Sequence, residues 1–172
     1  VIASGDANLA RNARLQLISM AEKQDPVEAA KTYEDMLENV TADEDKVRIL
    51  SRLANAYFKL QQYQKSIDAS QQLIDLALNA ESVSKALFIQ GNSHFKGGNY
   101  EQAIVAYRKI VDNYPQISWA NNAMFQTGMS YQKLSNNDLN ALPAVSKAFS
   151  DYYNTYPEDK NALFAYYYDA WA

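Results

Sequence analysis

Three lysines and two asparagines recur along the sequence at one fixed spacing. Lys59, Lys96 and Lys133 lie 37 residues apart, and Asn55 and Asn92 show the same interval. An asparagine side chain carries both donors and acceptors, so a column of them can hydrogen-bond the backbone of an extended peptide whatever its sequence. Neighbouring lysines would favour an acidic or carboxylate-bearing segment. The alternative interpretation is that the lysines complement helix dipoles and that the asparagines are ordinary surface residues.

Catalytic and metal-binding chemistry has little support in the same sequence. There is one histidine, His94, and there is no cysteine, so neither a histidine cluster nor a thiolate site can be assembled. We interpret His94 as a structural residue between helices. The acidic run Asp43-Glu44-Asp45 is typical of a helix N-terminus. We therefore expect no enzyme activity, no cofactor and no metal.

Composition restricts the class of protein and its partners. The chain has 172 residues, of which 48% are hydrophobic and 21% charged, which is typical of one soluble helical domain. The net charge of −4 provides no basic field for nucleic acid. No run of apolar residues is long enough to span a membrane. Because the first residue is Val1, we expect a preceding segment in the natural chain.

The elements that must position these side chains repeat with the same period. An offset of 37 residues brings small, aromatic and apolar residues into register in successive units. The matched sets are Leu17, Ala54, Gly91 and Gly128; Met20, Tyr57, His94 and Tyr131; Ala29, Ser66 and Ala103; and Tyr33, Ser70 and Tyr107. Such self-similarity predicts repeated helix pairs that bury their apolar faces against one another.

Residues 84–115 show the pattern of one pair most clearly. Apolar and small residues recur three and four apart on both sides of Gly97-Gly98-Asn99, which predicts two amphipathic helices and a tight turn. Gly91 lies on the apolar stripe of the first helix, where the lack of a Cβ lets a neighbouring helix approach closely. The second helix is expected to end at Tyr114-Pro115, because proline stops helix propagation.

The order of these residues resembles a tetratricopeptide repeat, a helix-turn-helix unit of about 34 residues. Residues at the signature positions are Leu87, Gly91, His94, Tyr100, Ala103, Tyr107 and Pro115. Two departures are His94, where tyrosine is usual, and Gln90, where leucine is usual. The resemblance implies an all-α fold, a right-handed α-solenoid of stacked antiparallel helix pairs.

We predict one domain that covers residues 1–172. Its repeats are expected at about 10–46, 47–83, 84–120 and 121–158, with an extra helix at 160–171. The fourth unit has five more residues than the third, which we assign to an enlarged turn at Ser135 to Leu142 with Pro143 near the next helix start. In the tail, Ala162-Leu163-Phe164 matches Ala123-Met124-Phe125, which predicts another first helix.

The resemblance also implies which side chains line the concave surface of the solenoid. The implied set is Arg48, Arg52, Asn55, Lys59, Lys85, Phe88, Asn92, Lys96, Asn122, Phe125, Met129 and Lys133. It is similar to the carboxylate clamp of chaperone cofactors in its Asn and Lys residues, but Phe88 and Phe125 depart from that pattern. The first hypothesis is a non-catalytic scaffold that binds a peptide or protein segment there, with Phe88 and Phe125 as apolar anchors.

The aromatic tail supports a second hypothesis. Residues 162–172 are apolar on nearly every side, whereas the terminal helix of a solenoid usually has one polar face. We therefore expect either that the natural chain continues beyond Ala172 or that a partner covers this helix. A structural module could self-associate through Phe164, Tyr167, Tyr168 and Trp171, because tyrosine is enriched at interfaces. The alternative is that the tyrosines pack between repeats with their hydroxyls at the rim. A third possibility is an appendage of an enzyme encoded beyond either end of the chain.

Two Tyr-Pro dipeptides suggest a cellular location. Tyr114-Pro115 and Tyr156-Pro157 are each followed by alanine and a bulky apolar residue. This pattern resembles the bacterial envelope branch of the repeat family, which includes the Tol-Pal coordinator and the lipoprotein subunit of the outer-membrane assembly machine. The resemblance implies a periplasmic or envelope-associated protein, and a cytoplasmic location is the alternative.

Overall fold

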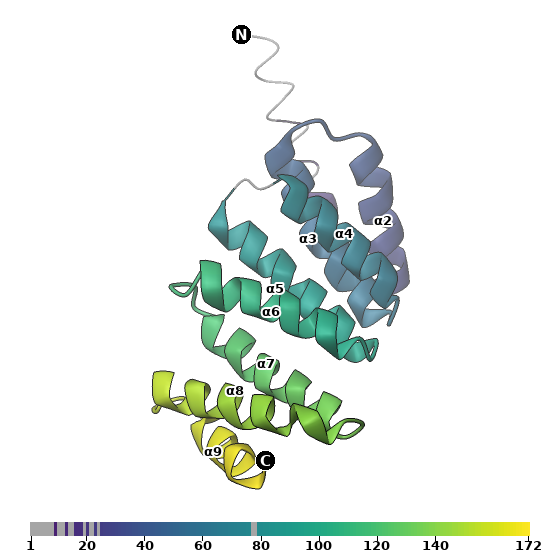
Figure 1. The fold of residues 1–172 in the computed structure, drawn as a ribbon. Helices are drawn as coiled ribbons and strands as arrows, with labels where there is room; N and C mark the ends of the chain where they lie inside the picture. The colour runs from purple at the N-terminus through teal and green to yellow at the C-terminus, as the bar shows by residue number, and fades with distance from the viewer. Residues whose placement is uncertain are drawn as a thin grey trace. The chain divides into compact units, whose positions relative to one another are not determined.

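The structure is a computed structural model, and it describes residues 9, 13, 16–18, 20, 23, 25–76 and 79–172. Every regular element in this part of the chain is helical (Figure 1). The residue contacts divide the chain into two compact units, Val1–Leu78 and Asn79–Ala172. The first part of the repeat predicted at about 10–46 lies mostly outside the described residues, and the single domain stays a prediction.

Unit 1 contains α2 (Pro26–Glu38), α3 (Asp43–Lys59) and α4 (Tyr63–Leu76). Asp25 caps α2, because its carboxylate accepts the backbone N–H groups of Val27 at 2.8 Å and Glu28 at 3.2 Å, and Pro26 follows at the first helical position. The run Asp43-Glu44-Asp45 opens α3, where negative charge suits the helix dipole. The central helix α3 packs against both α2 and α4.

Small residues bring α3 and α4 close together. The Ser66 hydroxyl on α4 donates to the Ala54 carbonyl oxygen on α3 at 2.8 Å, and both residues are buried. On the other side of α3, the Tyr57 hydroxyl donates to the Glu34 carboxylate on α2. Burial and this carboxylate raise the pKa of Tyr57 to about 12. The phenol therefore stays protonated and remains a donor to α2 at ordinary pH.

Unit 2 contains α5 (Ala80–Lys96), α6 (Tyr100–Asn113), α7 (Ala120–Ser135), the short 3-10 helix η1 (Leu139–Ala141), α8 (Leu142–Thr155) and α9 (Ala162–Trp171). Each α-helix packs against the next one along the chain, so α6 contacts both α5 and α7, and α8 contacts both α7 and α9 (Figure 1). The all-α architecture of consecutive antiparallel helix pairs is confirmed.

The predicted turn between the helices of the third repeat is present. Gly98 has φ of 81°, in the left-handed region that favours glycine, and α6 begins two residues later at Tyr100. At the other end, α6 stops at Asn113, directly before Tyr114-Pro115. Both boundaries of this helix therefore follow from backbone restrictions that the sequence shows.

Glycine and an aromatic ring meet at the same place in two helix pairs of unit 2. A Cβ added to Gly91 would lie 2.6 Å from Cε1 of Tyr107, and one added to Gly128 would lie 2.7 Å from Cε1 of Phe149. Both rings are fully buried. Phe149 also belongs to a core cluster with Val145, Tyr152 and Ala165. The glycines thus allow the rings to fill the space between paired helices.

The additional residues of the fourth unit lie where they were predicted. Helix α7 ends at Ser135, η1 occupies Leu139–Ala141, and Pro143 stands in the first turn of α8. Tyr107 and Phe149 occupy equivalent places opposite a glycine in two successive helix pairs. The interval between them is the 37-residue period plus the five additional residues of the fourth unit. We call this interval, from Tyr107 to Phe149, the lengthened period.

The predicted match of the tail is wrong by three positions. The backbone N–H of Ala123 donates to the Trp119 carbonyl, and that of Ala165, one lengthened period further on, donates to the Asn161 carbonyl. Ala165 therefore corresponds to Ala123, whereas the sequence comparison had matched Ala162 with Ala123. The turn that follows each Tyr-Pro pair sets the helix start, and a short run of similar side chains does not.

Candidate functional site

The twelve residues predicted to face a ligand lie on α3, α5 and α7, and none of them is buried. We call the four positions on each helix its open stripe. On α3 the stripe is Arg48, Arg52, Asn55 and Lys59; on α5 it is Lys85, Phe88, Asn92 and Lys96; on α7 it is Asn122, Phe125, Met129 and Lys133. The first belongs to unit 1 and the other two to unit 2.

The α5 stripe is accessible although the positions on both sides of it are buried. Leu87 and Gly91 border it on one side, where Gly91 faces Tyr107 of α6, and Ala86 and Ile89 border it on the other. Residues three and four apart share one face of a helix, so the stripe runs along the helix as a narrow accessible strip between two packed faces. A ligand could contact these side chains without displacing the core.

Two α5 stripe residues are fixed by one buried tyrosine. The Tyr107 hydroxyl on α6 donates to Oδ1 of Asn92 at 2.7 Å, and the Tyr107 ring meets Phe88 edge-on with centroids 5.8 Å apart. Burial raises the pKa of Tyr107, so the hydroxyl stays protonated. Because the hydroxyl occupies Oδ1, we expect the Nδ2 donors of Asn92 to meet a ligand. Sequence reasoning placed Tyr107 in the core but did not show this bond.

The α7 stripe is shared between the surface and the core. Phe125 lies 5.8 Å from Phe149 and 5.3 Å from Tyr152, measured between ring centroids, and Met129 packs against the same cluster. Asn122 is exposed near the start of the helix, and Lys133 is half-buried near its end. Phe125 is therefore held in place by aromatic neighbours while part of its ring stays accessible.

The α3 stripe has a different set of contacts. Asn55 donates through Nδ2 to the Ser51 carbonyl at 2.7 Å, and Nη1 of Arg48 lies 4.0 Å from the Asp45 carboxylate. Lys59 is exposed in the last turn. Asn55 and Asn92 thus use opposite ends of their amides within the protein, so the two asparagines would offer different groups to a ligand.

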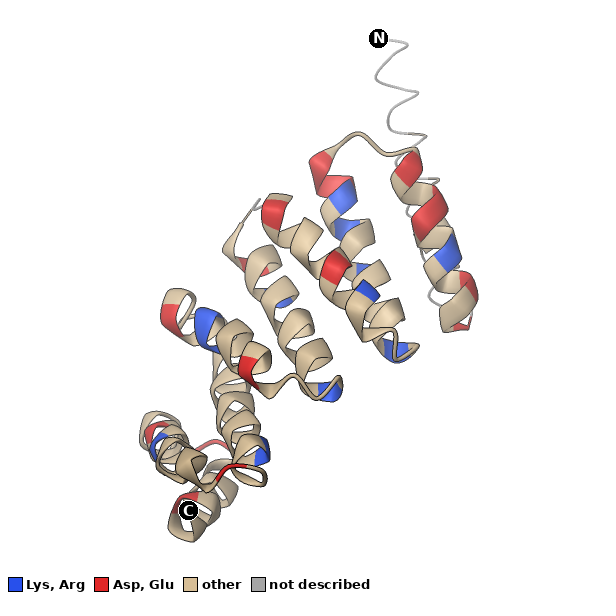
Figure 2. Cartoon of the chain, turned by 45° about the vertical axis from the view of Figure 1, so that its right-hand side comes forward, with Lys and Arg blue, Asp and Glu red and all other residues tan. Residues whose placement is uncertain are grey.

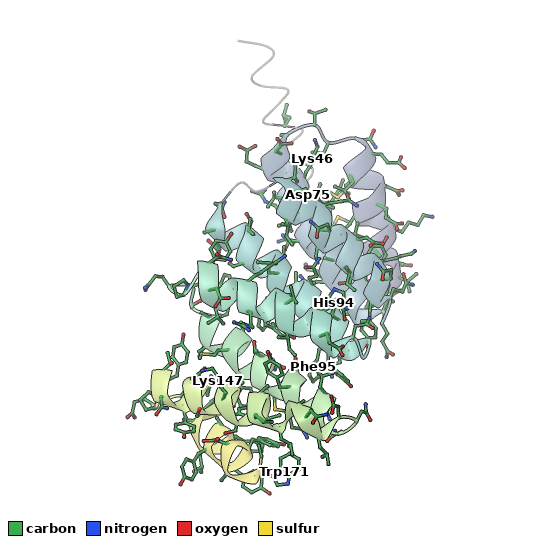
Figure 3. All side chains as sticks on the ribbon, viewed as in Figure 1. Lys46, Asp75, His94, Phe95, Lys147 and Trp171 are labelled. Carbon is green, nitrogen blue, oxygen red and sulfur yellow. The ribbon has the colours of Figure 1, made fainter. Side chains whose placement is uncertain are left out.

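The residues predicted for self-association divide into two kinds. Phe164, Tyr167 and Trp171 are exposed on α9, and Trp171 stands at its end (Figure 3). Tyr168 is half-buried and stacks on Phe149 with centroids 5.2 Å apart. Leu163 and Tyr166 are also exposed. Sequence reasoning included Tyr166 only in the tyrosine-rich tail as a whole, and it did not single out Leu163.

A separate hollow of about 190 Å³ lies on the other face of α7. Met124, Thr127 and Tyr131 form its floor, and α6 and α8 provide its walls, where Lys147 pairs with Asp151 at 3.0 Å. These floor residues are spaced three and four apart, on a different face from Phe125 and Met129. The hollow is therefore distinct from the open stripe of α7.

His94 takes a structural place in α5. It is half-buried, and its Nδ1 atom has no hydrogen-bond partner among the described residues. Burial lowers the pKa of this imidazole. In the described part of the chain, no group of three or more His, Cys, Asp or Glu side chains could hold a metal ion. None of the described helices is long and apolar enough to cross a membrane.

Comparisons with known proteins agree with this architecture. The crystal structure of the apo form of RapI superposes with a TM-score of 0.58 at 16% identity, covering 90% of this chain and 65% of RapI. The chain thus spans less than two thirds of RapI. The crystal structure of MamA gives a TM-score of 0.54 at 19% identity and covers 85% of both chains. None of the curated proteins matches the sequence significantly.

The family comparison concerns the two segments that the repeat period had brought into register. Tetratricopeptide repeat profiles match residues 47–79, which cover α4 and most of α3, and residues 85–116, which cover α6 and most of α5. The likeness to RapI and MamA, at 16% and 19% identity, shows the fold alone. The repeat profiles match the sequence and do not depend on that likeness. Residues 47–79 and 85–116 are therefore similar to tetratricopeptide repeats.

Proposed function

We propose that the protein is a non-catalytic scaffold that binds an extended segment of a partner protein through the open stripes of its first helices. The observation that carries the proposal is the α5 stripe, where Asn92 and Phe88 are held by Tyr107 and remain accessible between buried faces. A prearranged amide and ring lose little side-chain freedom on binding. Matches to tetratricopeptide repeats support a protein-interaction role.

The charges favour an acidic ligand. Lys96 ends α5 and Lys133 lies in the last turn of α7, so unit 2 has a cation in the last turn of each of these helices. An acidic segment would gain charge-assisted hydrogen bonds from them. In unit 1, Lys59 stands in the last turn of α3 and offers the same chemistry on its own helix. We propose an envelope location for this interaction on the basis of the Tyr-Pro pattern, and a cytoplasmic one is the alternative.

The proposal is tested by charge reversal with a matched control. A phage-displayed library of linear peptides is selected on the wild type, on Lys96→Glu/Lys133→Glu, and on Lys109→Glu/Lys160→Glu. The control lysines are exposed, lie outside the stripes and give the same change in net charge. We expect acidic peptides to be enriched by the wild type and the control but not by the stripe variant, while all three keep the same helical circular dichroism. Equal enrichment by the two variants would argue against the stripes.

A specific observation favours self-association as a second function. Leu163, Tyr166 and Ala170 of α9 lie one lengthened period after Asn121, Met124 and Gly128 of α7 and correspond to them. On α7 the Gly128 position is covered by Phe149 of α8, but Leu163 and Tyr166 are exposed. We propose that a second copy of the chain covers this face of α9. Two such faces can meet about a two-fold axis, because the ring of Tyr166 can lie on the partner's small Ala170.

A further inference from the structure

The same register shows that α9 also has an open stripe. Three backbone hydrogen bonds that open α7, donated by Ile117, Ala120 and Ala123, recur before α9 at Asp159, Ala162 and Ala165, one lengthened period later. The anchors Ala86, Ala123 and Ala165 of α5, α7 and α9 are all fully buried. Positions counted from these alanines are therefore equivalent on the three helices.

Counting from Ala165 assigns three aromatic residues to this stripe. Phe164, Tyr167 and Trp171 correspond to Asn122, Phe125 and Met129 on α7, and all three are exposed. Leu163 and Tyr166 are not part of it, since they correspond to the face that α8 covers on α7. The exposed aromatic surface of α9 therefore belongs to two different faces.

The chemistry of the stripe changes along unit 2. At the three positions that are present on all three helices, α5 has Lys85, Phe88 and Asn92, α7 has Asn122, Phe125 and Met129, and α9 has Phe164, Tyr167 and Trp171. Figure 2 shows that α9 carries little charge, and its one charged side chain, Asp169, accepts hydrogen bonds from Ser146 at 2.5 Å and Tyr153 at 2.8 Å on α8. The stripe is thus cationic at α5 and aromatic at α9.

We propose that unit 2 binds an extended peptide in a fixed orientation, with acidic side chains at α5 and bulky apolar or aromatic side chains at α9. This rests on the proposed function, and it adds the composition and order of the ligand. Carboxylates would meet Lys85 and Lys96, whereas a Leu, Phe or Trp side chain would pack among Phe164, Tyr167 and Trp171. At about 3.3 Å per residue, a peptide of about twelve residues reaches ~40 Å, enough to cross helices spaced ~8–10 Å apart.

Two fluorescein-labelled peptides of about this length test the order. The bipartite probe has a block of Asp and Glu, a Gly-Ser spacer, and a block of Leu, Phe and Trp. The acidic probe has Ser and Gly in place of the apolar block. Bipartite probes are made in both chain directions, because the stripe fixes which block meets which helix but not the direction of the peptide backbone. Binding to the whole protein is measured by fluorescence anisotropy.

Adjacent tyrosines supply a matched pair of variants. Tyr167 is 64% exposed and Tyr166 is 61% exposed, and each contacts one other tyrosine ring at a centroid distance of 5.7 Å. The two side chains belong to different faces of α9. We expect Tyr167→Ala to weaken binding of the better bipartite probe by about five- to tenfold, a usual loss for a buried aromatic anchor. Tyr166→Ala should leave that affinity within about twofold, as for residues outside an interface.

The outcomes separate this inference from the proposed function. The inference is supported if the bipartite probe binds the wild type more tightly than the acidic probe and loses that advantage in Tyr167→Ala. It is overturned if the two probes bind equally, or if the two tyrosine variants weaken binding alike. In either case the proposed function would still stand if the acidic probe binds the wild type and does not bind Lys96→Glu/Lys133→Glu. Absence of binding by both probes would overturn both. Circular dichroism of each variant checks that the fold is kept.

Discussion

Gly91 and Gly128 set the distance between the paired helices of unit 2. Glycine lowers helix stability by about 1 kcal/mol relative to alanine, so an exposed site would gain from Gly→Ala. At Gly91 the new Cβ would lie 2.6 Å from a fully buried ring, and that ring is also held by the hydrogen bond from Tyr107 to Asn92. The close approach therefore outweighs the gain in helix propensity.

We predict that Gly91→Ala lowers the free energy of unfolding by about 1–2 kcal/mol, because the cost of overpacking exceeds the propensity term. Urea denaturation followed by circular dichroism measures the change. Gly128→Ala should behave alike, since Cε1 of Phe149 lies 2.7 Å from the added Cβ. An increase in stability for either variant would show that the ring moves away freely.

His94 is the one histidine of the chain, and an unperturbed histidine has a pKa of about 6.5. Burial lowers its pKa in the folded state below the ordinary value of about 6.5 that holds in the unfolded chain. As the pH falls, the unfolded state therefore binds more protons than the folded state. The contribution of neutral His94 to folding stability is complete above about pH 6.5 and is lost as the pH falls through the pKa of His94 in the folded state.

We predict that the urea midpoint of the wild type is lower at about pH 5.5 than at about pH 7.5, and that His94→Gln shows a smaller difference. The comparison is between the two pH values within each protein, so a general loss of stability in the variant does not affect it. If the difference is unchanged in His94→Gln, other groups cause the acid sensitivity.

Single residues show how far the sequence could predict the site. The spacing of Gly91 and Tyr107 predicted a close helix pair, because both lie at fixed positions in a periodic pattern. Their consequence for Asn92 could not be predicted, since a hydrogen bond between α6 and α5 depends on the length and direction of two side chains. The asparagine column was likewise a prediction from spacing, yet Asn55 and Asn92 bond through different atoms.

At the scale of elements, α9 is held to α8 by both apolar and polar contacts. Ala165 and Tyr168 provide the apolar part, and Tyr168 stacks on Phe149. Asp169 provides the polar part by accepting from Ser146 and Tyr153, and this bond raises the pKa of Tyr153. The sequence predicted this helix from its apolar residues, but similar runs of side chains gave the wrong register, because the Tyr-Pro turn determines where it begins.

We predict that Asp169→Ala loosens α9 without unfolding α5 to α8. Loss of an ionised acceptor shared by two hydroxyls should lower hydrogen-exchange protection in α9 by roughly tenfold, which corresponds to about 1–2 kcal/mol. Asp169→Asn should have a smaller effect, because one amide oxygen still accepts. The measurement is amide exchange read by mass spectrometry for each helix. Equal loss throughout unit 2 would mean that α9 and the other helices open together.

For the whole molecule, the sequence predicted the repeat period and the all-α class, because each repeat must bury its apolar face against a neighbour. The number of compact units could not be predicted in the same way. Contacts group the chain on either side of residue 78, yet the periodic pattern runs through this point without a change. A repeating sequence specifies similar packing at every helix pair, so its pattern does not indicate where one compact unit ends and the next begins.

Self-association through α9 should be weak. Leu163 and Tyr166, the two large exposed side chains of this face, offer roughly 200 Å² per copy at about 100 Å² for each, which is far less than the ~800 Å² per partner of a standard interface. Leu163 is 80% exposed and is the more accessible of the two. We therefore expect a dimer with a dissociation constant in the micromolar range.

We predict that the wild type passes from monomer to dimer between about 5 and about 500 µM, concentrations that bracket a micromolar constant, as measured by light scattering. Leu163→Lys/Tyr166→Lys should remain monomeric, because four charges would face one another across the two-fold axis. Tyr167→Lys/Trp171→Lys adds the same charge on the open stripe and serves as the control, which should still dimerise. A wild type that is monomeric at every concentration would exclude self-association. If Tyr167→Lys/Trp171→Lys disrupts the dimer and Leu163→Lys/Tyr166→Lys does not, self-association would be assigned to Tyr167 and Trp171, and Leu163 and Tyr166 would have no role in it.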